Sequence, residues 1–328
     1  MILTFTATRW IEALKILVVT NLYPSDDRPS WGTFVKEQVE SLRAHCPELA
    51  VDVLVVEGYR SKLEYFRAMF RLPRIVTRDG YDIVHAHYGL TLISLIFVRV
   101  PVVVTFHGSD LLVSPVKYLC KLLARKASKS IVVARRLRYE LGYGEVIPCG
   151  IDVGHFSMPA DRTGAQCRHL SSSIRILFPG NPSNTVKNYS LFHAVCLELE
   201  RRGAHVEEVH LKNINRTDVP EVFWNCDLML LTSFSEGSPT VIKEAIAAKL
   251  PFVSVDVGDV KEWAGMVDFG VVAPDRDPKN IADAVVALLS RTKHRHSLDN
   301  SNCLEAMDIA KIAVRIKRLY GELLEERS

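Results

Sequence analysis

The stretch 228-LMLLTSFSEGSPTVIKE-244 combines a short apolar strand, a loop and the start of a helix. Its four leading apolar residues are typical of a strand that is buried on both faces of a parallel sheet. Pro239 suits the first turn of a helix, because the N–H that proline lacks would have no partner there. The stretch therefore predicts one strand–loop–helix unit of an α/β protein.

The start of this helix also predicts an anion-binding site. Free N–H groups around Ser238 to Val241, where only Pro239 lacks one, would point out of the helix N-terminus, and a diphosphate can accept hydrogen bonds there. Glu244 lies four residues after Thr240 on the same helix face, and a carboxylate can bind the two hydroxyls of a ribose or a sugar ring. We therefore predict a nucleotide site with six contributing residues: Gly237, Ser238, Pro239, Thr240, Val241 and Glu244.

Strands and helices alternate along the rest of the chain. The predicted strands are 15–20, 51–56, 83–87, 102–106, 131–133, 146–147, 174–178, 206–211, 228–231 and 252–255. The predicted helices are 33–45, 89–98, 188–201, 219–224, 240–249, 281–289 and 307–324, and residues 63–70 form a basic amphipathic segment. This alternation predicts doubly wound parallel sheets, which bind ligands at the carboxyl ends of their strands.

A polar stretch at 157–173, with Pro159, Gly164 and three consecutive serines, is typical of a linker. We therefore predict one domain over residues 1–156, a second domain over 157–304 and a final helix within 305–328. The two domains are expected to face each other across a ligand-binding cleft.

Composition excludes several classes of protein. Among 328 residues, 48% are apolar and 24% charged, which is globular rather than disordered or collagen-like. The net charge, 41 − 38 = +3, gives no reason to expect a nucleic-acid partner. The seven cysteines form no C-x-x-C pair, so the sequence predicts neither a disulfide framework nor a zinc knuckle.

Two further features predict a cytoplasmic protein. No apolar run reaches the ~18 residues of a membrane-spanning helix. Residues 1–14 place Arg9 and Glu12 where a signal peptide would be apolar, so we interpret them as a short extension before the first strand.

The motifs and their order resemble those of the retaining glycosyltransferases of family 4, which have the GT-B fold. In that family a strand is followed by Ser-x-x-Glu-Gly-x-Pro and a helix bearing a second glutamate. The resemblance extends from Lys15 to about Leu324 and includes Asn21-x-Tyr-Pro, Gly32, His85-Ala-His87, Thr105-Phe-His107-Gly-Ser-Asp110, Val146-Ile-Pro-x-Gly150-Ile-Asp152 and Glu262. It implies two Rossmann-like domains, an acceptor-side domain over 1–156 and a nucleotide-sugar donor domain over 157–304, and a C-terminal helix that crosses back to pack on the first.

The resemblance also implies roles for the matching residues. Glu236 would bind hydroxyls of the donor sugar and Glu244 the ribose, while Lys187 would neutralise the departing diphosphate. His107 would lie against the donor sugar and assist the reaction, and Gly32 would let the backbone approach the phosphates.

Two parts of the donor side leave the binding of the diphosphate and the identity of the base less defined. The family usually has an arginine six residues before the lysine, and here that position is Asn181. Backbone groups near Lys212 to Ile214 would contact the base, so side chains do not identify it.

We therefore expect a metal-independent hexosyltransferase without a cofactor, whose donor is a nucleotide-diphosphate sugar such as a UDP- or GDP-hexose. The acceptor would be a glycan or lipid-linked glycan in cell-surface polysaccharide synthesis, as in the exopolysaccharide and teichuronic-acid-type transferases that this sequence resembles. Two alternatives stay open: a GT-B nucleotide-sugar epimerase, and a non-catalytic nucleotide-sugar binder or scaffold of a glycan assembly complex, which the missing arginine favours.

Two residue pairs imitate metal sites. We place His85 and His87 on opposite faces of one strand, where they would not share an ion. Asp275 and Asp277 lie in a turn between Pro274 and Pro278, where capping of the next helix explains them better. No metal is therefore expected.

Basic residues are concentrated in the first 156 residues, which hold 20 basic and 15 acidic side chains. Apolar residues lie between them in segments around 60–78 and 117–129. Such a basic amphipathic surface can rest on an anionic membrane, so we expect peripheral contact with the inner face of the cell membrane. The alternative is a solvated helix face with its other side in the core.

Overall fold

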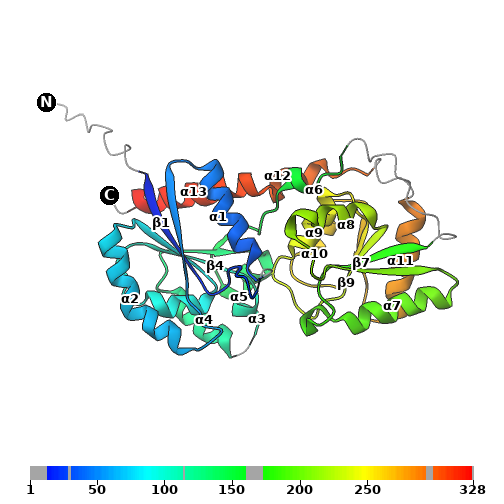
Figure 1. Ribbon diagram of the computed structural model, residues 1–328, viewed down its shortest axis with the longest axis horizontal. Coiled ribbons are helices and arrows are strands. Elements are labelled where there is room, and N and C mark those ends of the chain that lie inside the picture. Colours follow the sequence, from blue (N-terminus) through cyan, green and yellow to red (C-terminus); the bar gives the residue numbers. More distant parts are fainter. Residues whose placement is uncertain (1–12, 29–30, 114, 160–172, 293–297, 327–328) are drawn as a thin grey trace. The chain divides into compact units, whose positions relative to one another are not determined.

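The computed structural model describes residues 13–28, 31–113, 115–159, 173–292 and 298–326, which form two units (Figure 1). Unit 1 comprises residues 1–148 and 309–328, and unit 2 comprises residues 149–308. Residues 1–12 of the predicted extension and 160–172 of the predicted linker lie outside the described residues.

Unit 1 contains a six-stranded sheet in the order β2-β1-β3-β4-β5-β6, and all its pairings are parallel. The strands are β1 (Leu14–Thr20), β2 (Leu49–Val55), β3 (Ile83–His87), β4 (Val102–Phe106), β5 (Lys129–Val132) and β6 (Glu145–Val146). All six strands predicted in this part of the sequence are confirmed, with bounds that differ by at most two residues.

Helices cover both faces of this sheet, with α1 and α13 on one side and α2 and α4 on the other (Figure 1). The helices are α1 (Thr33–His45), α2 (Leu63–Asp79), the 3₁₀ helix η1 (Gly89–Leu95), α3 (Ser109–Leu112), α4 (Val116–Ala124), α5 (Arg135–Leu141) and α13 (Ile309–Glu325).

Two of these helices differ from what the sequence indicates. Helix α2 continues through Pro73 to Asp79, because Leu72 and Val76 are buried on its inner face and this packing outweighs the missing N–H. The helix predicted over 89–98 is present, but it is the 3₁₀ helix η1 and ends at Leu95.

Unit 2 contains a five-stranded parallel sheet in the order β11-β10-β9-β7-β8. Its strands are β7 (Ile174–Phe178), β8 (Val206–His210), β9 (Leu228–Leu231), β10 (Phe252–Ser254) and β11 (Gly270–Val272). Its helices are α6 (Val153–Phe156), η3 (Thr185–Lys187), α7 (Tyr189–Arg201), η4 (Arg216–Asp218), α8 (Val219–Asn225), α9 (Thr240–Ala247), α10 (Val260–Ala264), α11 (Pro278–Arg291) and α12 (Ser301–Met307).

The chain enters unit 2 earlier than the predicted boundary at 156/157. Ile151 and Phe156 are fully buried in the core of unit 2, and the Ile151 N–H donates to the carbonyl of Met307. The division therefore follows residue 148 rather than the polar stretch after residue 156.

The C-terminal helix α13 belongs to unit 1. Its apolar stripe, including Ile312, Ile316 and Tyr320, joins one core with residues of β1 and α1. The chain therefore leaves unit 1 after residue 148 and returns to it at residue 309. Among the described residues, no helix has both the length and the apolar content needed to cross a bilayer.

We predict that Ile316→Ala destabilises the protein by about 2–5 kcal/mol, because it leaves a cavity between α13 and the sheet. Urea unfolding followed by circular dichroism measures this loss. Val314 is 48% exposed on the same helix, so Val314→Ala should change stability by less than about 0.5 kcal/mol. Equal losses in the two variants would contradict the packing of α13 described above.

Candidate functional site

The predicted nucleotide site in unit 2 begins where β9 ends. The loop of residues 232–239 follows the strand, and α9 begins at Thr240 with Pro239 as its N-cap residue. No side chain caps this helix N-terminus. Its first N–H groups therefore receive no hydrogen bond from a side-chain cap, as an anion site requires.

Glu236 and Lys187, both expected at the site from the family resemblance, are in direct contact. The Lys187 Nζ donates to Glu236 Oε1 over 2.7 Å, and Ser233 Oγ donates to the same oxygen over 2.7 Å. Both ionic side chains are only partly exposed, at 21% for Lys187 and 17% for Glu236. A cation and a hydroxyl-binding carboxylate thus lie side by side next to the α9 loop.

The loop before Glu236 is held in place by backbone groups. Thr232 Oγ1 lies 3.1 Å from both the Lys187 and the Asn188 carbonyls, and the Phe234 N–H donates to the Val186 carbonyl. Arg276 donates to the carbonyls of the same loop, at 2.8 Å from that of Ser233. These bonds fix the Glu236 loop against η3, which carries Lys187.

A buried polar network supports the turn at Ser238. Lys243 Nζ donates to Ser238 Oγ over 2.6 Å, and that hydroxyl donates to Asp259 Oδ2 over 2.6 Å. Trp263 Nε1 donates to the same Asp259 oxygen over 2.8 Å. Because its hydroxyl is used inside the protein, Ser238 can serve a ligand only through its backbone.

Gly258 packs directly against this turn. Its φ is +57°, and a Cβ there would lie 2.6 Å from the Gly237 carbonyl oxygen. Only glycine allows the two loops to approach this closely. Gly258 therefore helps to fix the position of Gly237 and Pro239.

Glu244 is 1% exposed and its two carboxylate oxygens differ. Oε1 accepts a 2.7 Å hydrogen bond from Arg216, whose guanidinium also lies 5.0 Å from the Phe156 ring centre. Oε2 is buried without a hydrogen-bond partner. A buried carboxylate oxygen without a partner is costly, and a ligand hydroxyl would satisfy it.

Asn181 and Ile214, the two other residues predicted on the donor side, have no side-chain feature that points to a ligand. Asn181 is exposed, and its side-chain oxygen accepts from the Ser183 N–H, so it stabilises a turn rather than supplying a charge. Ile214 packs against the core of unit 2. Its backbone follows Asn213, which has a φ of +56°.

Gly32 and His107 lie in unit 1, near each other. Gly32 is the N-cap of α1 with a φ of +68°, and a Cβ would lie 2.3 Å from the Leu22 carbonyl. Phe34, two residues later, places its ring 4.6 Å from that of His107. Asp110 is fully buried and accepts the backbone N–H groups of His107, Gly108 and Gly89, which fixes the turn after β4.

His107 is one of three adjacent histidines. Its Nε2 lies 2.9 Å from Nδ1 of His87, and the His87 ring stacks on that of His85 with centres 4.5 Å apart. Burial lowers the pKa of His87 to about 3, and burial together with His87 lowers the pKa of His107. Both rings are therefore neutral at pH 7, so one nitrogen of the close pair donates and the other accepts.

The prediction that His85 and His87 point to opposite faces of β3 is wrong, because residues two apart in a strand share a face. His85 is instead bonded at both ring nitrogens, to Tyr320 at 2.6 Å and to Thr105 at 2.7 Å. No cluster of three or more metal-ligating side chains occurs within the described residues. Asp277 caps α11 by accepting the Lys279 N–H, as predicted.

Sequence reasoning missed several supporting residues. Arg216 and Arg276 lie outside the motifs, and nothing in their neighbourhood signals a contact with Glu244 or with the Glu236 loop. Lys243 stands inside the quoted stretch, but its partner Asp259 comes from another loop. His87 could have been linked to His107, because neighbouring parallel strands place their carboxyl ends at one edge of a sheet.

Comparison with known proteins finds one matching family model in each half of the chain. Residues 29–155 match the family model described as "Glycosyltransferase Family 4", and residues 194–314 match that described as "Glycosyl transferases group 1". A relative, TuaC of Bacillus subtilis, is a glycosyltransferase named for teichuronic acid biosynthesis. It is 24% identical over 86% of this chain and 90% of its own length.

Two further proteins are similar over different extents. An N-acetylgalactosaminyltransferase of Campylobacter jejuni, named for a diphospho-undecaprenol-linked acceptor, is 28% identical over 34% of this chain and 30% of its own length. The structure of HepE from Anabaena, solved with UDP and glucose, superposes with a TM-score of 0.67 at 16% identity, covering 94% of this chain and 100% of that one. This likeness shows the same fold of two Rossmann-like domains.

We predict that Asp259→Ala destabilises the protein by about 3–5 kcal/mol, because the buried Lys243 ammonium loses its carboxylate. Urea unfolding followed by tryptophan fluorescence and circular dichroism measures the loss. The matched double variant Lys243→Met/Asp259→Ala removes both charges and should recover most of this free energy. A double variant as unstable as Asp259→Ala would show that the unpaired charge is not the cause.

We also predict that stability falls as the pH drops below about 6.5, the usual pKa of histidine. Between that pH and the His87 pKa of about 3, the unfolded chain binds a proton that the folded protein does not. Each such histidine lowers the free energy of unfolding by about 1.4 kcal/mol per pH unit. His87→Gln should make this slope shallower by about that amount.

Urea unfolding of both proteins at several pH values from 8 down to about 4.5 tests this pH dependence. Values at pH 8, where the histidines are neutral in both states, serve as the reference for the packing effect of the substitution. Identical slopes for wild type and variant would refute a buried neutral His87.

Proposed function

The chain belongs to glycosyltransferase family 4, and on that premise we propose that it is a retaining hexosyltransferase. Its donor is a nucleotide-diphosphate sugar, and its acceptor is a glycan or lipid-linked glycan in cell-surface polysaccharide synthesis. The observation that carries this proposal is the grouping, around the loop 232–239 and α9, of an uncapped N-terminus, the Lys187–Glu236 pair and a buried Glu244 oxygen without a partner.

The donor nucleotide follows from the chemistry of this grouping. The N–H groups at the start of α9 hydrogen-bond the diphosphate, and the Lys187 ammonium balances part of its charge. A ribose hydroxyl donates to Glu244 Oε2, the buried oxygen that lacks a partner. Arg216, which already holds Oε1, keeps this carboxylate in position.

The sugar is bound through Glu236. Ser233 and Lys187 both donate to Oε1, so hydroxyls of the hexose donate to the remaining lone pairs of the carboxylate. The acceptor hydroxyl attacks the anomeric carbon from the side of the leaving diphosphate, the bond from that carbon to the diphosphate breaks, and the acceptor proton passes to a diphosphate oxygen. The configuration is thereby retained, and His107 of unit 1 assists.

Lys187 and the α9 N-terminus supply the positive potential that the leaving diphosphate needs, so we propose a reaction that requires no metal ion. Asn181 contributes no charge in place of the family's usual arginine. We propose that Lys187 and the backbone groups are sufficient without it.

The proposed acceptor rests on two relatives. One is named for teichuronic acid biosynthesis and the other for transfer to a sugar on diphospho-undecaprenol. We therefore propose a lipid-linked glycan as acceptor and a cytoplasmic enzyme that works as a peripheral protein at the inner face of the cell membrane.

We predict that Glu236→Ala lowers hexose transfer by at least about 100-fold, because the sugar loses its oriented carboxylate. Turnover of radiolabelled UDP- and GDP-hexoses, with and without a chelator, measures the loss and the metal requirement. Glu200→Ala, at an exposed position of α7, is the matched control and should keep wild-type activity. Undiminished transfer by Glu236→Ala would refute the assignment.

Thermal unfolding with nucleoside diphosphates separates the alternatives. A ligand at about 100 times its Kd stabilises the folded protein by about 2.7 kcal/mol. Glu236→Ala should keep this stabilisation, whereas Glu244→Ala should lose most of it. Stabilisation of the wild type by a nucleotide sugar without any turnover would favour the scaffold, and interconversion of the sugar at C2 would favour the epimerase.

A further inference from the structure

Helix α2 of unit 1 exposes two different faces beside its buried one. Its buried residues are Tyr65, Ala68, Leu72 and Val76. Arginines recur at spacings of four, three and four residues, which places them on one stripe of the helix surface. We call this stripe the arginine row: Arg67, Arg71, Arg74 and Arg78.

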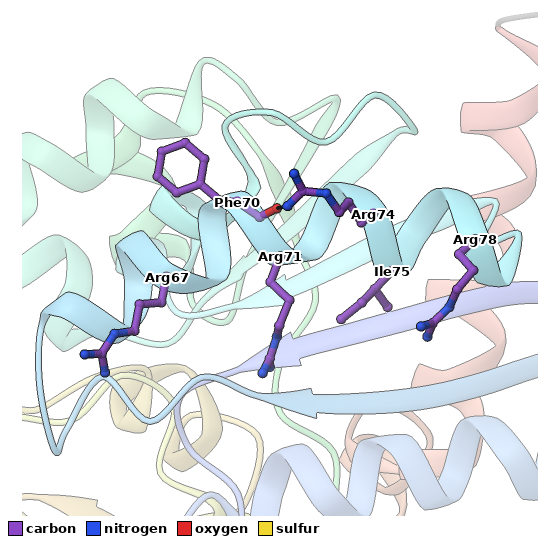
Figure 2. A pocket seen from close by; sticks show the side chains of 6 residues that line it. All are labelled: Arg67, Phe70, Arg71, Arg74, Ile75 and Arg78. Carbon is purple, nitrogen blue, oxygen red and sulfur yellow. Dashed lines mark hydrogen bonds between the residues drawn. The ribbon is translucent and has the colours of Figure 1, made fainter.

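Apolar side chains form a second exposed stripe next to the arginine row. Leu63 is 61% exposed, Phe66 50% and Phe70 59%. The exposed Phe97 ring, just after η1, lies 5.8 Å from that of Phe70. Figure 2 shows Phe70 on one side of the outward surface of α2, with Arg67, Arg71 and Arg78 extending to the other side.

Helix α4 continues this surface, because η1 contacts both α2 and α4. Together, the exposed apolar residues of α2, of α4 and of the residue pair after η1 form what we call the apolar face: Leu63, Phe66, Phe70, Ile96, Phe97, Tyr118, Leu119 and Leu122. Helix α4 and the two residues after it are basic again, at Lys117, Lys121, Arg125 and Lys126.

The arginine row retains free positive charge. Arg67 pairs with Glu64 and Arg78 with Asp79, while Arg74 donates to the Phe70 carbonyl. Within the described residues, the Arg71 side chain has no partner. The row lines a surface hollow of about 510 Å³, together with Phe70 and Ile75 (Figure 2).

From this juxtaposition we propose that the arginine row and the apolar face dock unit 1 on the surface of a bilayer that contains anionic lipids. Phe66, Phe70 and the neighbouring apolar side chains enter the boundary between headgroups and acyl chains. The arginines bind the lipid phosphates on one flank and the basic residues of α4 bind them on the other.

Charge complementarity favours a membrane over other partners. A soluble polyanion would use the arginines but would leave the apolar face in water. A protein groove for an apolar helix face needs no arginine row beside it. The surface deepens the proposed function, because a lipid-linked acceptor resides in the bilayer, but vesicle binding can be measured without donor or acceptor.

Sedimentation of the full chain with phosphatidylcholine vesicles, with and without phosphatidylglycerol, tests the proposal. Binding is expected only to the anionic vesicles and should weaken at high salt, because salt screens exposed charges. Arg71→Gln/Arg74→Gln should lower the partition coefficient about 25-fold, at about fivefold for each charge removed. Phe66→Asn/Phe70→Asn should lower it by at least about tenfold.

Lys311→Gln/Arg318→Gln is the matched control, since it removes two exposed charges from α13, on the opposite face of the sheet. It should bind vesicles as the wild type does, and all variants should keep the wild-type thermal unfolding midpoint. If the control loses as much vesicle binding as Arg71→Gln/Arg74→Gln, the loss depends only on the net charge of the protein. That outcome would overturn the proposal.

Two other outcomes would also overturn it. One is wild-type affinity for anionic vesicles in Arg71→Gln/Arg74→Gln. The other is that Phe66→Asn/Phe70→Asn binds heparin as tightly as the wild type does, and also binds vesicles as tightly as the wild type does. That result would identify a site for soluble polyanions. Loss of vesicle binding with hexose transfer to a soluble acceptor intact would support the docking surface separately from catalysis.

Discussion

Lys243 has no exposed surface, and the need to give its buried ammonium group partners constrains the loop before α9. Ser238 and Asp259 supply these partners, and Trp263 shares the same carboxylate oxygen. A buried charge without partners would cost several kcal/mol, so this loop cannot relax freely. The N-terminus of α9 and the Glu236 turn are therefore presented in one conformation, before any ligand arrives.

Buried polar side chains are also hydrogen-bonded to one another in unit 1. Tyr320 of the last helix reaches His85 in the middle of the sheet, His85 stacks on His87, and His87 is hydrogen-bonded to His107. Burial keeps these rings neutral by lowering the pKa of each. The tautomer of His107 is thus linked to residues of the sheet, which makes His87 a positioning residue for the proposed reaction.

The sequence was informative where one side chain type dictates one local structure. The apolar runs of β1 and β9 identify buried strands, and the Gly-Ser-Pro step before Thr240 identifies a helix start. It was less informative where partners come from distant loops, as with Asp259 and Arg216. It did not indicate that α2 continues through Pro73, where burial of the neighbouring residues outweighs the missing N–H, and it missed the strand β11, which has only three residues.

Helix α13 has a consequence for synthesis of the chain on the ribosome. Unit 2 is complete once residue 308 has emerged, whereas unit 1 still lacks Ile312, Ile316 and Tyr320 of its core. The part of unit 1 that precedes residue 149 therefore keeps the apolar surface that α13 later covers exposed to water while unit 2 folds. Such a nascent chain reverses the usual order in which the N-terminal domain folds first, and it presents chaperones with a defined surface to protect.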